Sequence, residues 1–385
     1  MEKKRFLLPA VEERLYFNTG TAGPLPLPTL QAMEQALQED AWRGRIGSSR
    51  MAKVFGLLAD TRKTIAAFFG ADPDEVAFTS RCTDGLNIVL WGLRWSQGDE
   101  IITTTHEHPG LLVPLVRLHQ ARGVVIRYVD PGGEAEGFLR RLEAAFSSRT
   151  RLVALSHVLW TRGMTLPLKA VVDLAHRHGA GVLVDGAQSA GVLPLDFRTS
   201  GVDYYAIPGQ KWLLGPEGTG ILLIRKDRLE EVGLTYGGYP SQKEVAPDRP
   251  EMVLKDGAQR YETGLPLPAA VVGLKSSLEF LHAISMDAIA AEVRRLVEKA
   301  YGLLREVPGL TLLTPPFEGG YEPSGLLTFR LEGWEDAEVV KALEQKGIIV
   351  RSLPRPFGGV RVSVHFFNTD EELEKLAGAL ANLHI

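Results

Sequence analysis

The segment Tyr204–Ile224, YYAIPGQKWLLGPEGTGILLI, contains a single lysine, Lys211, between two apolar runs. Proline and glycine mark the turn around this lysine, at Pro208, Gly209 and Gly215. The flanking runs are rich in Tyr, Ile and Leu, which is typical of two buried β-strands joined by a tight connection. A solvated surface lysine needs no such surroundings. We therefore predict that Lys211 is held at a fixed point in order to form a covalent bond.

Around this segment, over residues 74–225, short β-rich runs alternate with helical patterns. Runs such as GVLVD are apolar on both faces, as the strands of a buried parallel sheet are. The predicted strands are EVAFTS, DEIITTT, VVIRYVD, RLVALSH, GVLVDG, VDYYAI and GTGILLI. Helices between them are expected to begin at Asp84, Pro109, Glu134 and Leu168. This alternation predicts an α/β fold, an open sheet with helices on both sides.

The alternation of strands and helices stops at both ends of residues 74–225. Residues 1–30 include the Gly/Pro-rich NTGTAGPLPLP, and we expect an arm that packs on a C-terminal domain. The segment GGYPSQKEVAPDRP reads as a loop, and one long helix is predicted from about Pro268 to Glu306. Shorter strand and helix patterns follow. We predict three parts: the arm 1–30, a large domain 31–260 and a small α+β domain 261–385.

Composition narrows the class of protein. The chain has 385 residues, a net charge of −4 and no basic stripe or tail, so nucleic acid is not an expected partner. No apolar run reaches the ~18 residues of a membrane helix, and the N-terminus lacks the apolar region of a signal peptide. The single cysteine, Cys82, excludes an internal disulfide and a thiolate metal cluster. We expect a cytoplasmic protein.

Polar residues follow several predicted strands, which is where open α/β sheets bind their ligands. Thr83 precedes a helix, where it is either a plain N-cap or part of a phosphate site built on free N–H groups. His106 and His108 follow the next strand. A metal pair would need a third ligand at suitable spacing, and none follows, so no metal is expected.

Asp185 ends the strand GVLVD, Gln188 follows it, and Lys211 comes about 26 residues after the aspartate. This constellation suits pyridoxal phosphate: lysine bonds to the cofactor, and aspartate keeps the pyridine nitrogen protonated. A helix N-terminus would hold the phosphate. Nucleotide cofactors are disfavoured, because no G-x-G-x-x-G opens a helix after an early strand and no G-x-x-x-x-G-K-[ST] is present.

The segments DGAQSAGVLPLDF and GQKWLLGPEGTG resemble the class V aminotransferase family of fold type I pyridoxal phosphate enzymes. That family includes cysteine desulfurases, selenocysteine lyases and isopenicillin N epimerases. The likeness extends from YFNTGTAGPLP to VRVSVHFFNTDEE, nearly the whole chain. It implies a large domain with a mostly parallel seven-stranded sheet flanked by helices, a smaller α+β C-terminal domain, and a homodimer with shared active sites.

The resemblance also implies roles for individual residues. Lys211 resembles the lysine that bonds to the cofactor, and Asp185 resembles the partner of the pyridine nitrogen. Gln188 resembles the donor to the phenolic oxygen, and His108 resembles the histidine stacked on the ring, which could also protonate the leaving sulfur. The residues expected around the phosphate are Cys82 (through its amide), Thr83, Gln210 and Gly264, the last in the segment RYETGLP that reaches into the partner subunit's site.

The substrate of such an enzyme is an amino acid. Arg361 resembles the arginine that clamps its α-carboxylate, a planar group that suits a bidentate guanidinium. Trp160 stands where desulfurases have an asparagine, and it is expected to form a wall of the substrate pocket. Asn18, in YFNTGTAGPLP, is the third expected substrate-binding residue.

The chain departs from the family pattern in ways that bear on its reaction. Many relatives read Ser-x-His-Lys where this chain has Pro208, Gly209, Gln210 and Lys211, and Leu265 replaces a frequent threonine, so the phosphate cup has fewer side-chain donors. Desulfurases carry a catalytic cysteine on a loop before the carboxylate-binding arginine. The matching segment, VRSLPRPFGGVRVSVH, has none, and a persulfide cannot form there without a nucleophilic sulfur.

The motifs EHPG, RLVALSHVLWTRGMTLPL and DGAQSAGVLPLDF are most similar to the cysteine/cystine C–S lyase branch. We therefore predict a pyridoxal phosphate lyase that releases pyruvate, ammonia and sulfide or persulfide by β-elimination. Cys82 is expected to be packed and inert. The alternatives are an aminotransferase, an isopenicillin N epimerase-like enzyme, a cysteine desulfurase or selenocysteine lyase, and a non-catalytic cofactor-binding partner of a sulfur pathway.

Overall fold

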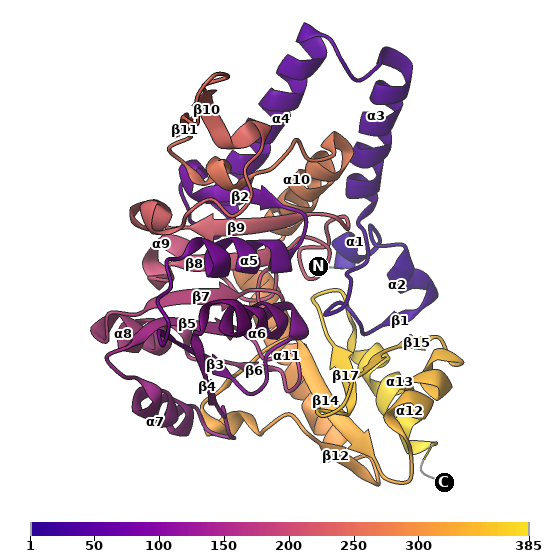
Figure 1. Cartoon of the computed structure of the whole chain (residues 1–385). Helices are drawn as coiled ribbons and strands as arrows, with labels where there is room; N and C mark the ends of the chain where they lie inside the picture. The colour runs from indigo at the N-terminus through magenta and orange to yellow at the C-terminus, as the bar shows by residue number, and fades with distance from the viewer. Residues whose placement is uncertain (1, 384–385) are drawn as a thin grey trace.

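A computed structural model describes residues 2–383 of the chain, and its centre is a seven-stranded sheet (Figure 1). The strand order is β2-β9-β8-β7-β5-β3-β4. All neighbouring strands are parallel except at β9, which is antiparallel to both β2 and β8. The strands are β2 (Val76–Thr79), β3 (Glu100–Thr104), β4 (Val125–Val129), β5 (Thr150–Ser156), β7 (Gly181–Asp185), β8 (Tyr204–Pro208) and β9 (Gly220–Ile224). The mostly parallel α/β sheet predicted from the sequence is confirmed, strand by strand.

Helices connect these strands and cover the sheet. They are α5 (Cys82–Gly92), α6 (Pro109–Arg122), α7 (Ala135–Ala145), α8 (Leu168–Arg177) and the short α9 (Phe197–Ser200). Strands β8 and β9 are buried along their whole length, since they are covered on both faces. Helix α5 begins two residues before the predicted start, with Arg81 as its N-cap. The prediction that Thr83 caps this helix is therefore wrong, because Thr83 lies inside the first turn.

The C-terminal part contains a second, four-stranded antiparallel sheet in the order β12-β14-β17-β16. Its strands are β12 (Leu310–Leu312), β14 (Leu326–Leu331), β16 (Arg351–Ser352) and β17 (Val360–Ser363), with helices α11 (Met286–Arg305), α12 (Asp336–Glu344) and α13 (Asp370–Ala381). A short pair joins β6 (Met164–Thr165) to β13 (Glu322–Pro323).

Two local predictions in this half are wrong. The single helix expected from Pro268 to Glu306 is two helices, α10 (Pro268–His282) and α11, because Ser285 adopts a left-handed φ of 83°. Helix α10 packs on α3 and α4. The segment expected to be a loop, residues 237–250, contains β10 (Gln242–Val245), which forms a hairpin with β11 (Met252–Leu254) just beyond it. The three-part division of the chain remains a prediction.

The N-terminal segment crosses from one part of the molecule to the other. It contains α1 (Glu2–Arg5), α2 (Ala10–Glu13) and β1 (Leu15–Tyr16), and β1 pairs in parallel with β15 (Ile348–Ile349). Helices α3 (Leu27–Arg43) and α4 (Ser48–Phe69) then form a hairpin whose tip projects beyond the body of the molecule (Figure 1). Over residues 2–383, none of the helices has the length and apolarity needed to cross a membrane.

Candidate active site

Lys211 lies in the connection between β8 and β9, and the sequence around it explains the tightness of the turn. The amide of Gly215 donates to the carbonyl oxygen of Gly209 at 2.9 Å, and Leu214 takes a left-handed φ of 56°. A Cβ at Gly209 would meet the Thr219 hydroxyl at 2.0 Å, so glycine is required there. Burial lowers the pKa of Lys211, and the nearby Asp185 carboxylate opposes this shift.

Asp185 ends the central strand β7 and is 4% exposed. Its Oδ1 accepts a hydrogen bond from the amide of Ala187 at 2.9 Å and lies 3.2 Å from the thiol sulfur of Cys82. Among the residues that the structure describes, no donor approaches Oδ2 within hydrogen-bond distance. Lys211 follows β8 and Asp185 ends the neighbouring strand β7, so the sheet places the lysine and the aspartate predicted from the sequence at the same edge, where the carboxylate acts to raise the pKa of the lysine.

The N-terminus of α5 adjoins this pair. The amides of Cys82 and Thr83 belong to its first turn, whose N–H groups have no acceptor within the helix. The carboxylate of Asp84 accepts from the amide of Ser80 at 3.1 Å, which fixes the entry into the turn. Oε1 of Gln210, next to Lys211, is buried and has no hydrogen-bond partner among the described residues. The two free amides of α5 suit a bound phosphate, as expected from the sequence, whereas Gln210 can donate to one only through its Nε2.

His108 is the N-cap of α6, and its Nδ1 accepts from the amide of Gly110 at 2.9 Å. Its ring meets that of Trp160 edge to face, with centroids 4.9 Å apart. Burial, reinforced by the positive charge of Lys211, lowers the pKa of His108 to about 4. The imidazole is therefore neutral at pH 7, with its proton on Nε2, and can lie flat against an aromatic ring.

His106 has a different hydrogen-bond partner from His108. Its Nδ1 lies 2.7 Å from the hydroxyl of Thr161. Within residues 2–383, no three side chains of the metal-binding types gather into a possible metal site.

Gln188 has a fixed amide orientation. Its Oε1 accepts from the indole of Trp212 at 2.8 Å, and its Nε2 donates to the carbonyl oxygen of Gly20 at 3.0 Å. An amide nitrogen has two hydrogens, so one N–H remains for a ligand. Trp212 directly follows Lys211, and the turn that holds the lysine thus also orients the glutamine.

Arg361 on β17 is fully buried, and no carboxylate of residues 2–383 pairs with it. Its Nη1 donates to the carbonyl oxygen of Trp160 at 3.3 Å, its Nη2 donates to the hydroxyl of Thr21 at 3.2 Å, and its Nε has no partner. Burial, followed by the repulsion of Arg351, lowers the pKa of Arg361 to about 9. A buried guanidinium whose N–H groups are not all hydrogen-bonded is suited to bind a carboxylate.

Arg351 is the functional candidate that sequence reasoning missed. It lies directly opposite Arg361 in the β16–β17 pair and also donates to the Thr21 hydroxyl, at 3.2 Å. Only the register of this pair brings the two arginines together. The one sequence feature that points to Arg351 is its position in VRSLPRPFGGVRVSVH, the segment that matches the desulfurase cysteine loop.

Two predicted site residues lie at the margin. Asn18 reaches the arginines only through Thr21, whose hydroxyl donates to Asn18 Oδ1 at 2.7 Å. Gly264 lines a surface groove of about 1160 Å³ together with Ser80 and Asp84, beside the N-terminus of α5.

Trp160 is 2% exposed and also faces Phe357, with ring centroids 5.7 Å apart, so it forms part of an aromatic wall.

Known proteins are similar to this chain over nearly its whole length. The chain is 32% identical to a structure of the cystine C–S lyase C-DES in complex with its reaction product cysteine persulfide, with a TM-score of 0.92 over 97% of this chain and 99% of that one. A C-DES mutant with glycine covalently linked to its pyridoxal phosphate cofactor matches equally well, at 32% identity and a TM-score of 0.92 over 98% and 99% of the two chains.

A probable cysteine desulfurase from Methanothermobacter thermautotrophicus is 31% identical, over 98% of this chain and 96% of its own length. An apo structure of the cysteine desulfurase from Thermococcus onnurineus NA1 is 27% identical, with a TM-score of 0.90 over 99% and 97% of the chains. The class-V aminotransferase family matches residues 14–376. The fold, the lysine-bearing turn and these matches agree, and the chain belongs to the class-V aminotransferase family.

Proposed function

We propose that this protein is a pyridoxal phosphate-dependent C–S lyase that acts on cystine or a similar sulfur amino acid. The observation that carries this proposal is the pair of guanidinium groups, Arg351 and Arg361, which share Thr21 and have no carboxylate partner within residues 2–383. Each can bind one carboxylate, and cystine has two. The structural similarity to a cystine C–S lyase supports the same substrate class.

When bound, pyridoxal phosphate supplies an electron sink that acidifies the Cα proton of the amino acid. The first-turn amides of α5 would hold its phosphate, and Oδ2 of Asp185 would face the ring nitrogen. His108 would pack its neutral ring against the cofactor ring. Each of these groups is already ordered by contacts within the protein, so little reorganisation is required.

Lys211 is the proposed base. A lysine takes up a proton efficiently when its pKa approaches the working pH, and burial shifts Lys211 in that direction. The Cα proton would pass to its Nζ. The C–S bond would then break with its electron pair on the departing sulfur, and hydrolysis of the remaining carbon skeleton gives pyruvate and ammonia. No oxidant or reductant is required.

A cysteine desulfurase is the second candidate, because several relatives carry that name. Its chemistry requires a nucleophilic thiolate. The only thiol, that of Cys82, is buried beside Asp185, and burial together with that carboxylate raises its pKa well above the ordinary value. The elimination reaction needs no protein thiol and is therefore preferred.

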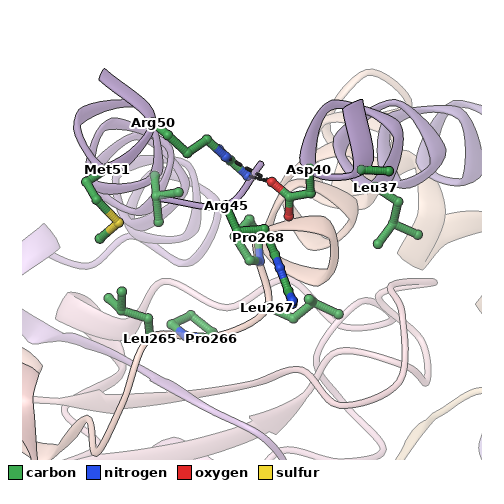
Figure 2. A pocket seen from close by; sticks show the side chains of 11 residues that line it. Leu37, Asp40, Arg45, Arg50, Met51, Leu265, Pro266, Leu267 and Pro268 are labelled. Carbon is green, nitrogen blue, oxygen red and sulfur yellow. Dashed lines mark hydrogen bonds and ion pairs between the residues drawn. The ribbon is translucent and has the colours of Figure 1, made fainter. Parts of the chain in front are cut away.

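The working unit is proposed to be a homodimer. Trp42 and Ile46, at the tip of the α3–α4 hairpin, are both 87% exposed, which is unusual for large apolar side chains on a monomer. Figure 2 shows Leu265 and Leu267 facing the α3–α4 hairpin, whose Asp40 and Arg50 are joined by an ion pair. The segment with Gly264 would reach the partner's phosphate site. Sedimentation should give a dimer in the wild type and a monomer in Leu267→Asp.

Product analysis tests the function. The cofactor-loaded protein is mixed with cysteine and, separately, with cystine in the absence of added thiol, and the carbon products are identified. Stoichiometric pyruvate and ammonia support the lyase. Alanine would indicate a desulfurase, a keto acid formed with retention of the amino group on the cofactor would indicate an aminotransferase, and an inverted Cα would indicate an epimerase.

A further inference from the structure

Cys82 and Asp185 are separated by 103 residues in the sequence and meet in the buried floor of the candidate site. The sulfur of Cys82 lies 3.2 Å from Oδ1 of Asp185. The same oxygen accepts the amide of Ala187 at 2.9 Å. The carboxylate is therefore approached by two donors on one oxygen, while Oδ2 stays open toward the site.

The thiol has only one hydrogen and two possible acceptors. The second is the carbonyl oxygen of Ala206, on β8, at 3.3 Å from the sulfur. An ionised carboxylate is the stronger acceptor, and its distance is slightly shorter. Burial and the Asp185 charge both raise the pKa of Cys82, so the sulfur keeps its proton and remains a donor at neutral pH.

We propose that Cys82 is a positioning residue, whose thiol donates to Oδ1 of Asp185 and thereby holds Oδ2 in the direction of the cofactor's ring nitrogen. Without this bond, the amide of Ala187 would be the one remaining donor to the carboxylate among the described residues. The carboxylate could then rotate about its Cβ–Cγ bond and lose alignment with the ring. This role rests on the proposed cofactor site, but the hydrogen bond itself does not.

The hydrogen bond can be measured directly, because the chain has one cysteine and therefore one S–H stretching band. The infrared spectrum of the purified full-length protein is recorded with and without bound pyridoxal phosphate, in the wild type and in Asp185→Asn. Cys82→Ala identifies the band by its loss. We expect a band at low frequency in the wild type, typical of a bonded thiol, that moves to higher frequency in Asp185→Asn, since a neutral amide is a weaker acceptor. A band that stays in place would assign the thiol to Ala206 and overturn the proposal.

A second measurement covers the possibility that Asp185→Asn does not fold. The dissociation constant of pyridoxal phosphate is compared in the wild type, Cys82→Ala and Cys82→Ser. Loss of one hydrogen bond corresponds to roughly five-fold weaker binding in Cys82→Ala. Cys82→Ser keeps a donor and should lie within about two-fold of the wild type. Equal weakening in both variants, or none in Cys82→Ala, would contradict the positioning role while leaving the lyase proposal intact.

Discussion

Arg351 and Arg361 both donate a hydrogen bond to the hydroxyl oxygen of Thr21, each at 3.2 Å, and face each other in the β16–β17 register. Burial, followed by the repulsion between these two like charges, lowers the pKa of Arg361. Over residues 2–383 no carboxylate relieves either charge. A bound carboxylate would do so, and the role proposed for the pair is to bind an anionic substrate.

The two arginines should have separable effects. Arg361→Gln should lower kcat/KM for every amino acid tested, by roughly 10- to 100-fold, since a charged hydrogen bond is lost. Arg351→Gln should lower kcat/KM by a similar factor for cystine, but by less than about three-fold for a substrate with one carboxylate. Steady-state kinetics with cystine and S-methylcysteine checks this. Equal losses on both substrates in Arg351→Gln would rule out a second carboxylate site.

Lys211 is expected to carry the covalent bond and the proton transfer. Lys211→Ala should abolish turnover without unfolding the protein, because the turn is held by backbone hydrogen bonds at Gly209 and Gly215. Borohydride treatment of the cofactor-loaded wild type should label one peptide, which contains Lys211. Lys275→Ala, a change to another lysine on α10, serves as the matched control and should retain both activity and labelling. Retained turnover in Lys211→Ala would remove the basis of the mechanism.

Two buried histidines should make the protein sensitive to acid. Burial lowers the pKa of His157 to about 4 and that of His365 to about 3, below the ordinary value of 6.5. Because the folded pKa lies below the unfolded one, the stabilisation is complete above pH 6.5 and is lost as the pH falls toward these values. The free energy of unfolding in urea should fall between pH 7 and pH 5 by about 2 kcal/mol for each such histidine.

Substitution separates this effect from general acid instability. His365→Phe has no ring that can be protonated, so it should reduce the pH dependence by about a third, because His108 and His157 also have lowered pKa values. The variant also loses the bond from Nε2 to the carbonyl oxygen of Trp212. His282→Phe, at the exposed end of α10, should leave the slope unchanged. Parallel pH curves for the wild type and His365→Phe would show that this residue does not titrate as proposed.

A buried ion pair holds the segment before Gly264. Nη1 of Arg62 lies 2.8 Å from Oε1 of Glu262, with both side chains less than 8% exposed, and the same oxygen accepts from the amide of Phe78 at 3.0 Å. Glu262→Ala leaves a buried guanidinium unpaired and should lower the free energy of unfolding by about 3–5 kcal/mol. Glu251→Ala breaks an exposed pair with Arg249 and should cost less than about 1 kcal/mol. Urea unfolding of both variants gives the comparison. A loss below 1 kcal/mol in Glu262→Ala would contradict the assigned role.

The sequence predicted those elements whose signal is local. All seven strands of the large sheet were found because each is an apolar run bounded by polar or glycine-rich turns. Helices α3 and α4 were not assigned. In α3, Thr29 is the one described residue that is buried, so the helix has little of the apolar periodicity that marks a helix packed on a core. The break between helices α10 and α11 at Ser285 could not be predicted either, because no glycine or proline stands there.

Within the candidate site, the residues that stand in local motifs can be predicted from the sequence, and those that depend on strand pairing cannot. Lys211 and Asp185 each stand at a strand end that the sequence defines. Arg351 becomes a candidate only through its register with Arg361, and the contact of Cys82 with Asp185 spans 103 residues. Neither relationship is encoded in a local pattern, because each requires the tertiary arrangement of strands.

C–S cleavage by this protein is proposed to need no protein thiol, and the Cys82→Ser variant tests this most directly because it contains no cysteine at all. This variant is loaded with pyridoxal phosphate and mixed with cystine, and pyruvate and alanine are quantified over time. We predict pyruvate, released with sulfane sulfur, at a rate within about three-fold of the wild type. Alanine as the product, or a fully folded and cofactor-loaded variant without turnover, would contradict the account.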